Sequence, residues 1–170
     1  LAPSFIEALV PVLVQAGESP GSPCEIPPQQ IAASLSLEAQ VYQSLVLGVR
    51  DYASKNKFTG VVLGLSGGID SALTLAIAVD ALGSDRVQAV MMPFTYTSEL
   101  SLDAAAQQAN KLGVDYQKIS IEAIYSSFMQ SLEAQFENTE TDASEQNLQA
   151  RCRGVLLMAI SNKKGLLVLT

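Results

Sequence analysis

The stretch that decides the fold is Val61-Val62-Leu63-Gly64-Leu65-Ser66-Gly67-Gly68-Ile69-Asp70-Ser71. Its first five residues form an apolar run without alternation, which is typical of a strand covered on both faces in a parallel sheet. The residues that follow, as far as Leu82, are rich in Ala and Leu and stop at Gly83, which predicts a helix with a C-terminal glycine. The segment therefore predicts a strand, a tight glycine loop and a helix.

The same order of elements recurs on both sides of this unit. A helix over 37–56, with Ser36 as N-cap, is predicted before it from apolar positions three to four residues apart. After it, strands are predicted at 87–92, 114–120 and 166–170, and helices at 101–112, 121–135 and 144–162. Strands that alternate with helices of this length predict an α/β fold with a doubly wound parallel sheet in three layers.

The first part of the chain has a different composition. Residues 15–34 hold two glycines and four prolines among small polar residues, a composition that commonly links domains. We therefore expect residues 1–35 to be the tail of a preceding domain with its linker, and residues 36–170 to be the α/β part. The start at Leu1 and the end inside an apolar run lead us to expect a fragment of a longer protein.

Charge and cysteine usage narrow the class of protein. The net charge is −7 and the pI is about 4.5, which argues against nucleic acid as a partner because such binding draws on clustered Lys and Arg. Cys24 and Cys152 have no metal-ligand spacing and suggest no disulfide framework, so we expect a reducing, cytoplasmic setting. No apolar run reaches the roughly 18 residues of a membrane span, and a membrane partner is not expected.

The chain contains no histidine, so Ser-His-Asp triads and HExxH metal sites cannot be assembled from it. Catalysis would have to rest on carboxylates, backbone amides, Arg, Lys and bound metal.

The loop from Gly64 to Ser71 carries the predicted chemistry. In open α/β sheets ligands bind at the carboxyl ends of strands, where a helix N-terminus offers N–H groups to an anion. Gly67 and Gly68 allow a tight turn and a close approach of the backbone to a phosphate, while Ser66 and Ser71 add hydroxyl donors. We therefore interpret residues 64–71 as a phosphate-binding loop.

This loop is not the common P-loop, which needs a Lys where Ile69-Asp70-Ser71 stands. A carboxylate beside bound phosphates would repel them unless a cation sat between, so we infer Mg²⁺ with Asp70 as its ligand. The alternative is that Asp70 merely caps the helix and the glycines form an ordinary turn.

The residues from Ser66 to Ser71 resemble the SGGxDS loop of the N-type ATP pyrophosphatases, which includes NAD synthetases, GMP synthetases and several tRNA-modifying enzymes. The resemblance implies an adenine-nucleotide alpha-hydrolase-like (Rossmann-like) fold and ATP as co-substrate, bound by Gly64, Leu65, Ser66, Gly67, Gly68, Ile69, Asp70 and Ser71.

Two further segments narrow the resemblance to NAD synthetases. Residues 145–154 are similar to their ENxQAR-R-G helix start, which implies contacts of Asn147 and Arg151 with deamido-NAD. Residues 90–98 are similar to the stretch under adenine and ribose, with the backbone of Met91 or Met92 as the candidate contact. The alternatives are a solvated surface helix for the arginines and a simple core strand for the methionines.

The helix over 38–52 resembles the lead-in helix of glutamine-dependent NAD synthetases, in which a glutaminase domain precedes it. The implied reaction is amidation of deamido-NAD through an adenylated carboxylate, with ammonia from glutamine and release of AMP and pyrophosphate. The family also implies a dimer-based homo-oligomer, for which the apolar face of this helix is a candidate; intrachain packing is the alternative.

Other functions stay open at this point. A GMP synthetase-like relative is disfavoured by residues 145–153, and a tRNA-thiolating enzyme by the acidic charge and the missing CxxC. A non-catalytic adenine-nucleotide-binding module is the alternative from another class. Because the family's next ATP-contacting and metal-binding positions would lie beyond Thr170, we expect residues 1–170 alone to bind nucleotide poorly and to be inactive.

Overall fold

The computed structural model describes residues 2–15, 23–28, 31–137 and 139–170. It divides into two compact units, Leu1–Leu47 and Gly48–Thr170. In the first unit, the described residues before α1 form no helix or named strand, and their one isolated bridge joins Gln15 to Glu25 by two backbone hydrogen bonds of 2.8 and 3.0 Å. Part of the predicted linker, at residues 16–22 and 29–30, lies outside the described residues.

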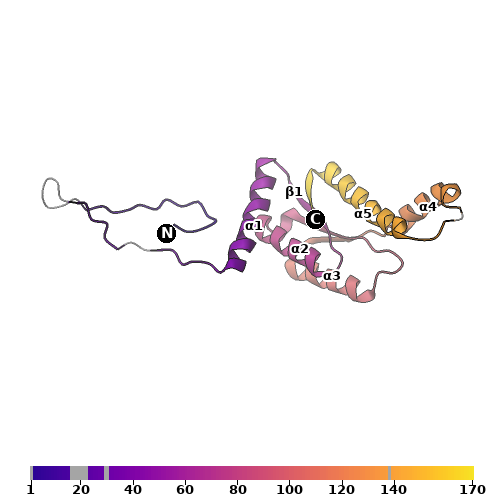
Figure 1. Ribbon diagram of the computed structural model, residues 1–170, viewed down its shortest axis with the longest axis horizontal. Coiled ribbons are helices and arrows are strands. Elements are labelled where there is room, and N and C mark those ends of the chain that lie inside the picture. The colour runs from indigo at the N-terminus through magenta and orange to yellow at the C-terminus, as the bar shows by residue number, and fades with distance from the viewer. Residues whose placement is uncertain (1, 16–22, 29–30, 138) are drawn as a thin grey trace. The chain divides into compact units, whose positions relative to one another are not determined.

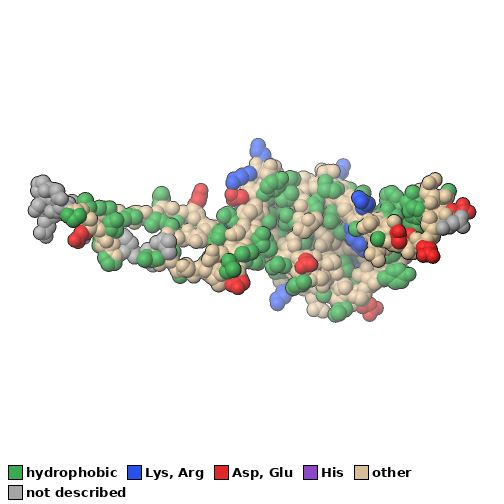
Figure 2. Space-filling view, viewed as in Figure 1, with side chains coloured by type: hydrophobic (Ala, Val, Ile, Leu, Met, Phe, Trp, Pro, Cys, Tyr) green, Lys and Arg blue, Asp and Glu red, His purple; other side chains and the backbone are tan. Residues whose placement is uncertain are grey.

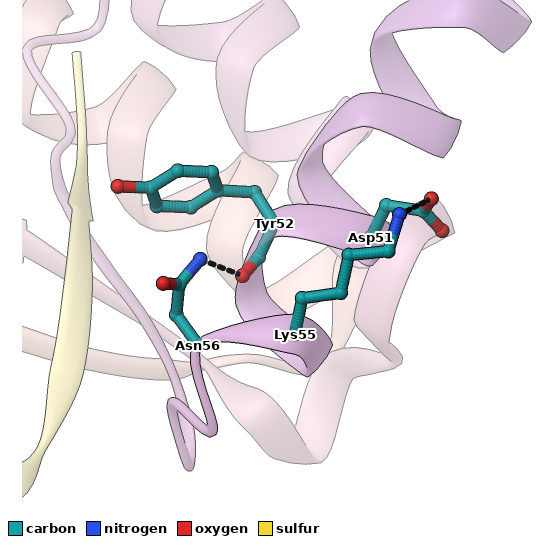
Figure 3. A network of polar contacts seen from close by, with 4 residues as sticks. All are labelled: Asp51, Tyr52, Lys55 and Asn56. Carbon is teal, nitrogen blue, oxygen red and sulfur yellow. Dashed lines mark hydrogen bonds and ion pairs between the residues drawn. The ribbon is translucent and has the colours of Figure 1, made fainter.

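Helix α1, Leu37–Lys55, is capped as predicted by Ser36, whose hydroxyl accepts from the Ala39 N–H at 3.2 Å. Its last turn is closed by local polar contacts (Figure 3). Lys55 pairs with the Asp51 carboxylate at 2.7 Å, and the Asn56 side chain donates to the Tyr52 carbonyl at 2.8 Å. The ion pair is exposed, so its contribution to stability is small.

Four strands form the sheet, and all pair in parallel in the order β3-β2-β1-β4. Their bounds are β1 Gly60–Gly64, β2 Val87–Met91, β3 Asp115–Lys118 and β4 Leu166–Leu169. In the register, Val61 lies opposite Val87 on one side and Leu167 on the other. The predicted parallel α/β sheet is confirmed.

The helices of the second unit follow the predicted order, with small shifts at their starts. They are α2 Ile69–Leu82, the short 3₁₀ helix η1 Ser84–Arg86, α3 Glu99–Leu112, α4 Glu122–Phe136 and α5 Ala143–Lys164. Helix α3 begins two residues before the predicted start because the Ser98 hydroxyl caps it, accepting from the Ser101 N–H. Strand β3 is shorter than predicted, although Ile119 beyond it still donates to the Met91 carbonyl at 2.8 Å.

The sheet lies between two layers of helices, and a hydrophobic core fills the space on each of its faces (Figure 1). The fold therefore has three layers. One core packs Val61 and Leu63 of β1 against α2 and α3, through residues such as Leu75 and Ala105. The other core packs Val62 of β1 and Val90 of β2 against α5, with Cys152 and Leu157. Neighbouring residues of one strand thus serve opposite faces, as the unalternating apolar run predicts.

Cysteine burial differs sharply along the chain, since Cys24 is exposed while Cys152 is 1% exposed within the second core; both are free. Among the described residues, no helix combines the length and apolarity that crossing a membrane would require.

Candidate functional site

The loop between β1 and α2 is held by its own serines. The Ser71 hydroxyl donates to the Gly68 carbonyl at 2.9 Å and accepts from the Ser66 N–H at 3.2 Å. Because its single hydrogen is used there, the Ser66 hydroxyl is the donor in the 3.0 Å contact between the two hydroxyls. The Ser66 oxygen also accepts from the Gly68 N–H at 3.2 Å. These contacts tie the loop to the first turn of α2.

The two glycines of the loop have different roles. Gly67 has φ +81°, and a Cβ there would lie 2.4 Å from the Ser101 carbonyl oxygen of α3. Gly68 has φ −87°, and a Cβ there would lie 3.4 Å from the Ser66 hydroxyl. The close approach of the loop to α3 therefore requires glycine at position 67.

The start of α2 presents N–H groups to the end of the loop. Its N-cap is Gly68, whose carbonyl accepts the first helical hydrogen bond from Ala72 at 3.1 Å. The N–H groups of Ile69, Asp70 and Ser71 precede that bond, so they have no acceptor within the helix. Together with the helix dipole they favour an anion at this position.

Asp70 lies in the first turn of α2 with an exposed side chain. The N-cap of α2 is Gly68, and within the described residues the Asp70 carboxylate has no hydrogen bond or ion pair. The alternative interpretation of Asp70 as a helix cap is therefore not supported. The described residues also contain no group of three or more Asp, Glu, Cys or His side chains able to hold a metal. Asp70 is thus a single free carboxylate beside the glycine loop.

A cavity of about 440 Å³ lies at the carboxyl ends of β1, β2 and β4 and is bordered by α5. Its lining residues are Gly64, Leu65, Ser66, Val90, Met91, Met92, Thr97, Ala150, Arg153, Gly154, Leu157, Leu169 and Thr170. Five predicted residues thus meet around one space: Gly64, Leu65, Ser66, Met91 and Met92. Residues 67–71, Asn147 and Arg151 are not among its lining residues.

The floor of the cavity at the end of β2 has its carbonyl groups already bonded. The Val90 carbonyl accepts from the Leu65 N–H at 2.9 Å, and the Met91 carbonyl from Ile119 at 2.8 Å. The Met92 carbonyl accepts from Nε of Arg153 at 3.1 Å. The Met91 and Met92 side chains are buried, with Met92 at 7% exposure, so they belong to the core as well as to the cavity wall.

Helix α5 carries both arginines of the motif but presents them differently. Arg153 is half-buried and lines the cavity, whereas Arg151 and Asn147 are exposed. Figure 2 shows basic side chains over the region of α5 and acidic ones gathered at the α4–α5 end. The sequence analysis named Arg151 as a site residue, whereas Arg153 lines the cavity and shares the spacing of the lining residues Ala150 and Leu157.

The start of α5 is fixed by a capping box. The Asp142 side chain accepts from the Ser144 N–H at 2.7 Å, and Glu145 accepts from the Asp142 N–H at 2.9 Å. Hydrogen bonds from the backbone N–H of Ser144, and to a lesser extent from its side chain, hold the pKa of the Asp142 carboxyl below its ordinary value. This capping box fixes where the helix that borders the cavity begins.

With this geometry in view, comparison with known proteins decides the family. The family profile described as NAD synthase matches residues 41–170. The chain belongs to the NAD synthase family.

Several relatives of this family share long alignments with the chain. A glutamine-dependent NAD(+) synthetase of Acinetobacter baylyi is 58% identical over 139 residues, which are 82% of this chain and 26% of that protein. A glutamine-dependent NAD(+) synthetase of Rhodobacter capsulatus is 45% identical over 168 residues, 99% of this chain and 30% of that protein. The chain therefore spans less than a third of the length of these NAD synthase family members.

A solved structure of the same family has the same fold. The glutamine-dependent NAD+ synthetase of Acinetobacter baumannii, in complex with adenosine diphosphate, superposes with a TM-score of 0.82 at 55% identity. The match covers 85% of this chain and 27% of that one. The α/β fold predicted from the sequence is therefore the fold of this solved member of the NAD synthase family.

Proposed function

We propose that the full-length protein is a ligase that amidates deamido-NAD to NAD with ATP, using ammonia released from glutamine. The observation that carries the proposal is the serine-tied glycine loop at the end of β1, which borders a 440 Å³ cavity in a member of the NAD synthase family. Loops of this kind, with helix N–H groups behind them, bind phosphate groups.

The proposed reaction has two steps. The nicotinate carboxylate of deamido-NAD attacks the α-phosphorus of ATP, and pyrophosphate leaves. Ammonia then attacks the adenylated carboxyl carbon, forms the amide and expels AMP. No protein nucleophile is needed, so catalysis rests on positioning and on neutralising the negative charge of the phosphates. In this proposal residues 64–71 hold the phosphates, and the backbone of Met91 or Met92 contacts adenine.

Mg²⁺ fits the donor set of the loop. Mg²⁺ is usually held by one or two carboxylates together with phosphate oxygens and water. Asp70 is a free, exposed carboxylate in the first turn of α2, next to N–H groups suited to phosphate. We propose that Asp70 holds the ion, which would neutralise charge on the pyrophosphate while the loop N–H groups hold its oxygens.

The deamido-NAD side of the proposal uses α5. Asn147 and Arg151 are exposed side chains four residues apart, and thus one turn apart on the same helix face. A guanidinium there can grip a phosphate or carboxylate with two parallel hydrogen bonds. We propose these two residues as contacts for deamido-NAD.

The remaining parts of the proposal concern the whole protein. Residues 1–35 would be the tail and linker of a glutaminase domain, and residues 36–170 the first part of the synthetase domain. We propose a cytoplasmic, dimer-based assembly. The α1 residues available for its interface are exposed apolar ones, Leu37 at 73%, Val41 at 52% and Leu45 at 48%.

The test uses the full-length protein with Mg²⁺, ATP, deamido-NAD and either glutamine or ammonium, and follows NAD, AMP and ADP together. We expect NAD with stoichiometric AMP from both nitrogen sources and no ADP. AMP without NAD would point to another acceptor. No AMP under any condition would contradict ligase chemistry and favour a nucleotide-sensing role.

A further inference from the structure

The chain has four arginines, and three of them anchor Nε on a backbone carbonyl. Arg50 donates from Nε to the Ala81 carbonyl and from Nη2 to the Asp80 carbonyl, at 3.1 and 3.3 Å. Arg86 does the same with the carbonyls of Thr59 and Phe58, at 3.0 and 3.1 Å. In both residues the guanidinium fork is used to join elements of the fold.

Arg153 differs from these two arginines. Its Nε donates to the Met92 carbonyl at 3.1 Å, and within the described residues its guanidinium makes no other hydrogen bond or ion pair. A guanidinium has five N–H donors in a fixed plane, so the anchor orients the group and leaves both terminal nitrogens free to donate. The anchor thus holds a pre-oriented cation.

The position of this cation indicates its use. Arg153 is half-buried and is the only charged residue lining the 440 Å³ cavity, whose other described lining residues are neutral. Gly64, Leu65 and Ser66, from the loop that we propose holds phosphate, line the same cavity. A partly buried cation without a counter-charge is costly, and an anionic ligand would provide that charge.

We propose that Arg153 binds a phosphate oxygen of the nucleotide in this cavity, through the terminal nitrogens that the Met92 anchor leaves free. This inference rests on the proposed function, and it assigns the phosphate to ATP because the cavity joins the start of the loop to the end of β2. Arg151, which lies outside the cavity lining, serves a different ligand.

The test compares R153M, R153K and R151M with K163M in the full-length protein. Lys163 is an exposed cation in the last turn of α5 and outside the cavity lining, so K163M removes the same charge from the same helix. Equilibrium affinities are measured for Mg²⁺-ATP, adenosine and deamido-NAD. Loss of a charge-assisted contact predicts a weakening of ATP binding by about tenfold to a hundredfold in R153M.

Adenosine, which has no phosphate, should bind R153M within about twofold of the parent protein, since no charge-assisted contact is lost. R153K should be intermediate for ATP, because an ammonium keeps the charge but loses the fork. R151M and K163M should leave ATP affinity unchanged. If R153M does not fold, the R153K measurement with ATP and adenosine decides.

Three results would overturn the inference. Equal losses for ATP and adenosine would mean that Arg153 only supports the Met92 backbone, and a loss confined to deamido-NAD would assign the phosphate to the dinucleotide. Unchanged ATP affinity in R153M would also overturn it. Failure of the parent protein itself to bind ATP would instead contradict the proposed function, so the two failures are distinguishable.

Discussion

The loop from Gly64 to Ser71 and the helix face that carries Arg153 border the same cavity, but their contacts span very different distances along the chain. The serines of the loop tie it by hydrogen bonds between residues no more than five positions apart. Arg153 reaches a carbonyl 61 residues away. Local contacts form wherever the segment is folded, whereas the arginine anchor exists only when α5 packs on the sheet. The two sides should therefore respond differently to substitution.

The largest effect is expected at the loop side from Asp70→Ala. If the carboxylate holds the cation that neutralises pyrophosphate, the variant should lower kcat by at least about a hundredfold. Because the side chain is exposed and forms no capping bond, the unfolding free energy should change by less than about 0.5 kcal/mol. Steady-state kinetics and denaturant unfolding check both statements, with Asp70→Asn as the isosteric companion. A rate equal to that of the parent protein would remove Asp70 from the metal site.

The next largest effect, a loss of stability, is expected from Gly67→Ala. This variant tests the packing of the loop against α3. The new Cβ would meet the Ser101 carbonyl oxygen at 2.4 Å, at a φ of +81°. Strain and overpacking together predict a loss of about 2–4 kcal/mol in unfolding free energy.

Gly48→Ala is the matched control for that glycine substitution. Gly48 lies within α1, and a Cβ there would meet no atom within 4 Å. The substitution should stabilise the protein by about 0.5–1 kcal/mol, because helix interiors disfavour glycine. The unfolding free energies of both variants are measured by denaturant unfolding. A Gly67→Ala variant as stable as Gly48→Ala would contradict the packing of the loop on α3.

A smaller effect is expected from Ser71→Ala, which removes the hydroxyl that joins Ser66 to Gly68. Water can replace these partners in an open loop, so the unfolding free energy should fall by only about 0.5–1.5 kcal/mol. Affinity for Mg²⁺-ATP should fall by about tenfold because the loop loses its closed shape. Ser36→Ala removes the cap of α1 instead, and should cost a similar amount of stability without any change in ATP affinity.

The smallest effect, on thermal stability, is expected at the capping box of α5, the helix that carries Arg153. The pKa of the Asp142 carboxyl is lowered in the folded protein, so its stabilising contribution is present above the ordinary Asp pKa and is lost as pH falls through the folded value. That window lies below about pH 4. In Asp142→Asn the cap cannot titrate, so the difference in Tm between parent and variant should shrink as the pH is lowered from 6 to 3. A constant difference would contradict the role of this carboxylate.

Sequence patterns predicted the loop side well because its determinants are local. An apolar run, a pair of glycines and an Ala-rich helix specify strand, turn and helix without reference to the rest of the chain. What they could not distinguish was the need for each glycine, since only the packing of Ser101 against Gly67 separates it from Gly68. Such a clash depends on where α3 lies.

The arginine side was harder to predict because α5 is apolar on more than one face. Leu157 is buried, but Val155 and Met158 are 61% and 49% exposed. Apolar residues on both faces leave the rotation of the helix ambiguous, and two arginines at positions 151 and 153 then compete for the same role. The capping box at Asp142 and Glu145 was readable from the sequence and would have improved the predicted start of the helix.

Cys152, which is buried and precedes Arg153 in α5, also provides a way to measure how often α5 opens. A thiol at 1% exposure cannot meet an alkylating reagent while the helix is packed, whereas the exposed Cys24 reacts at once. The slow phase of labelling by a small thiol reagent would then report how often this helix leaves the sheet. If a bound nucleotide bridges the loop and α5, it should lengthen that slow phase and leave the fast one unchanged.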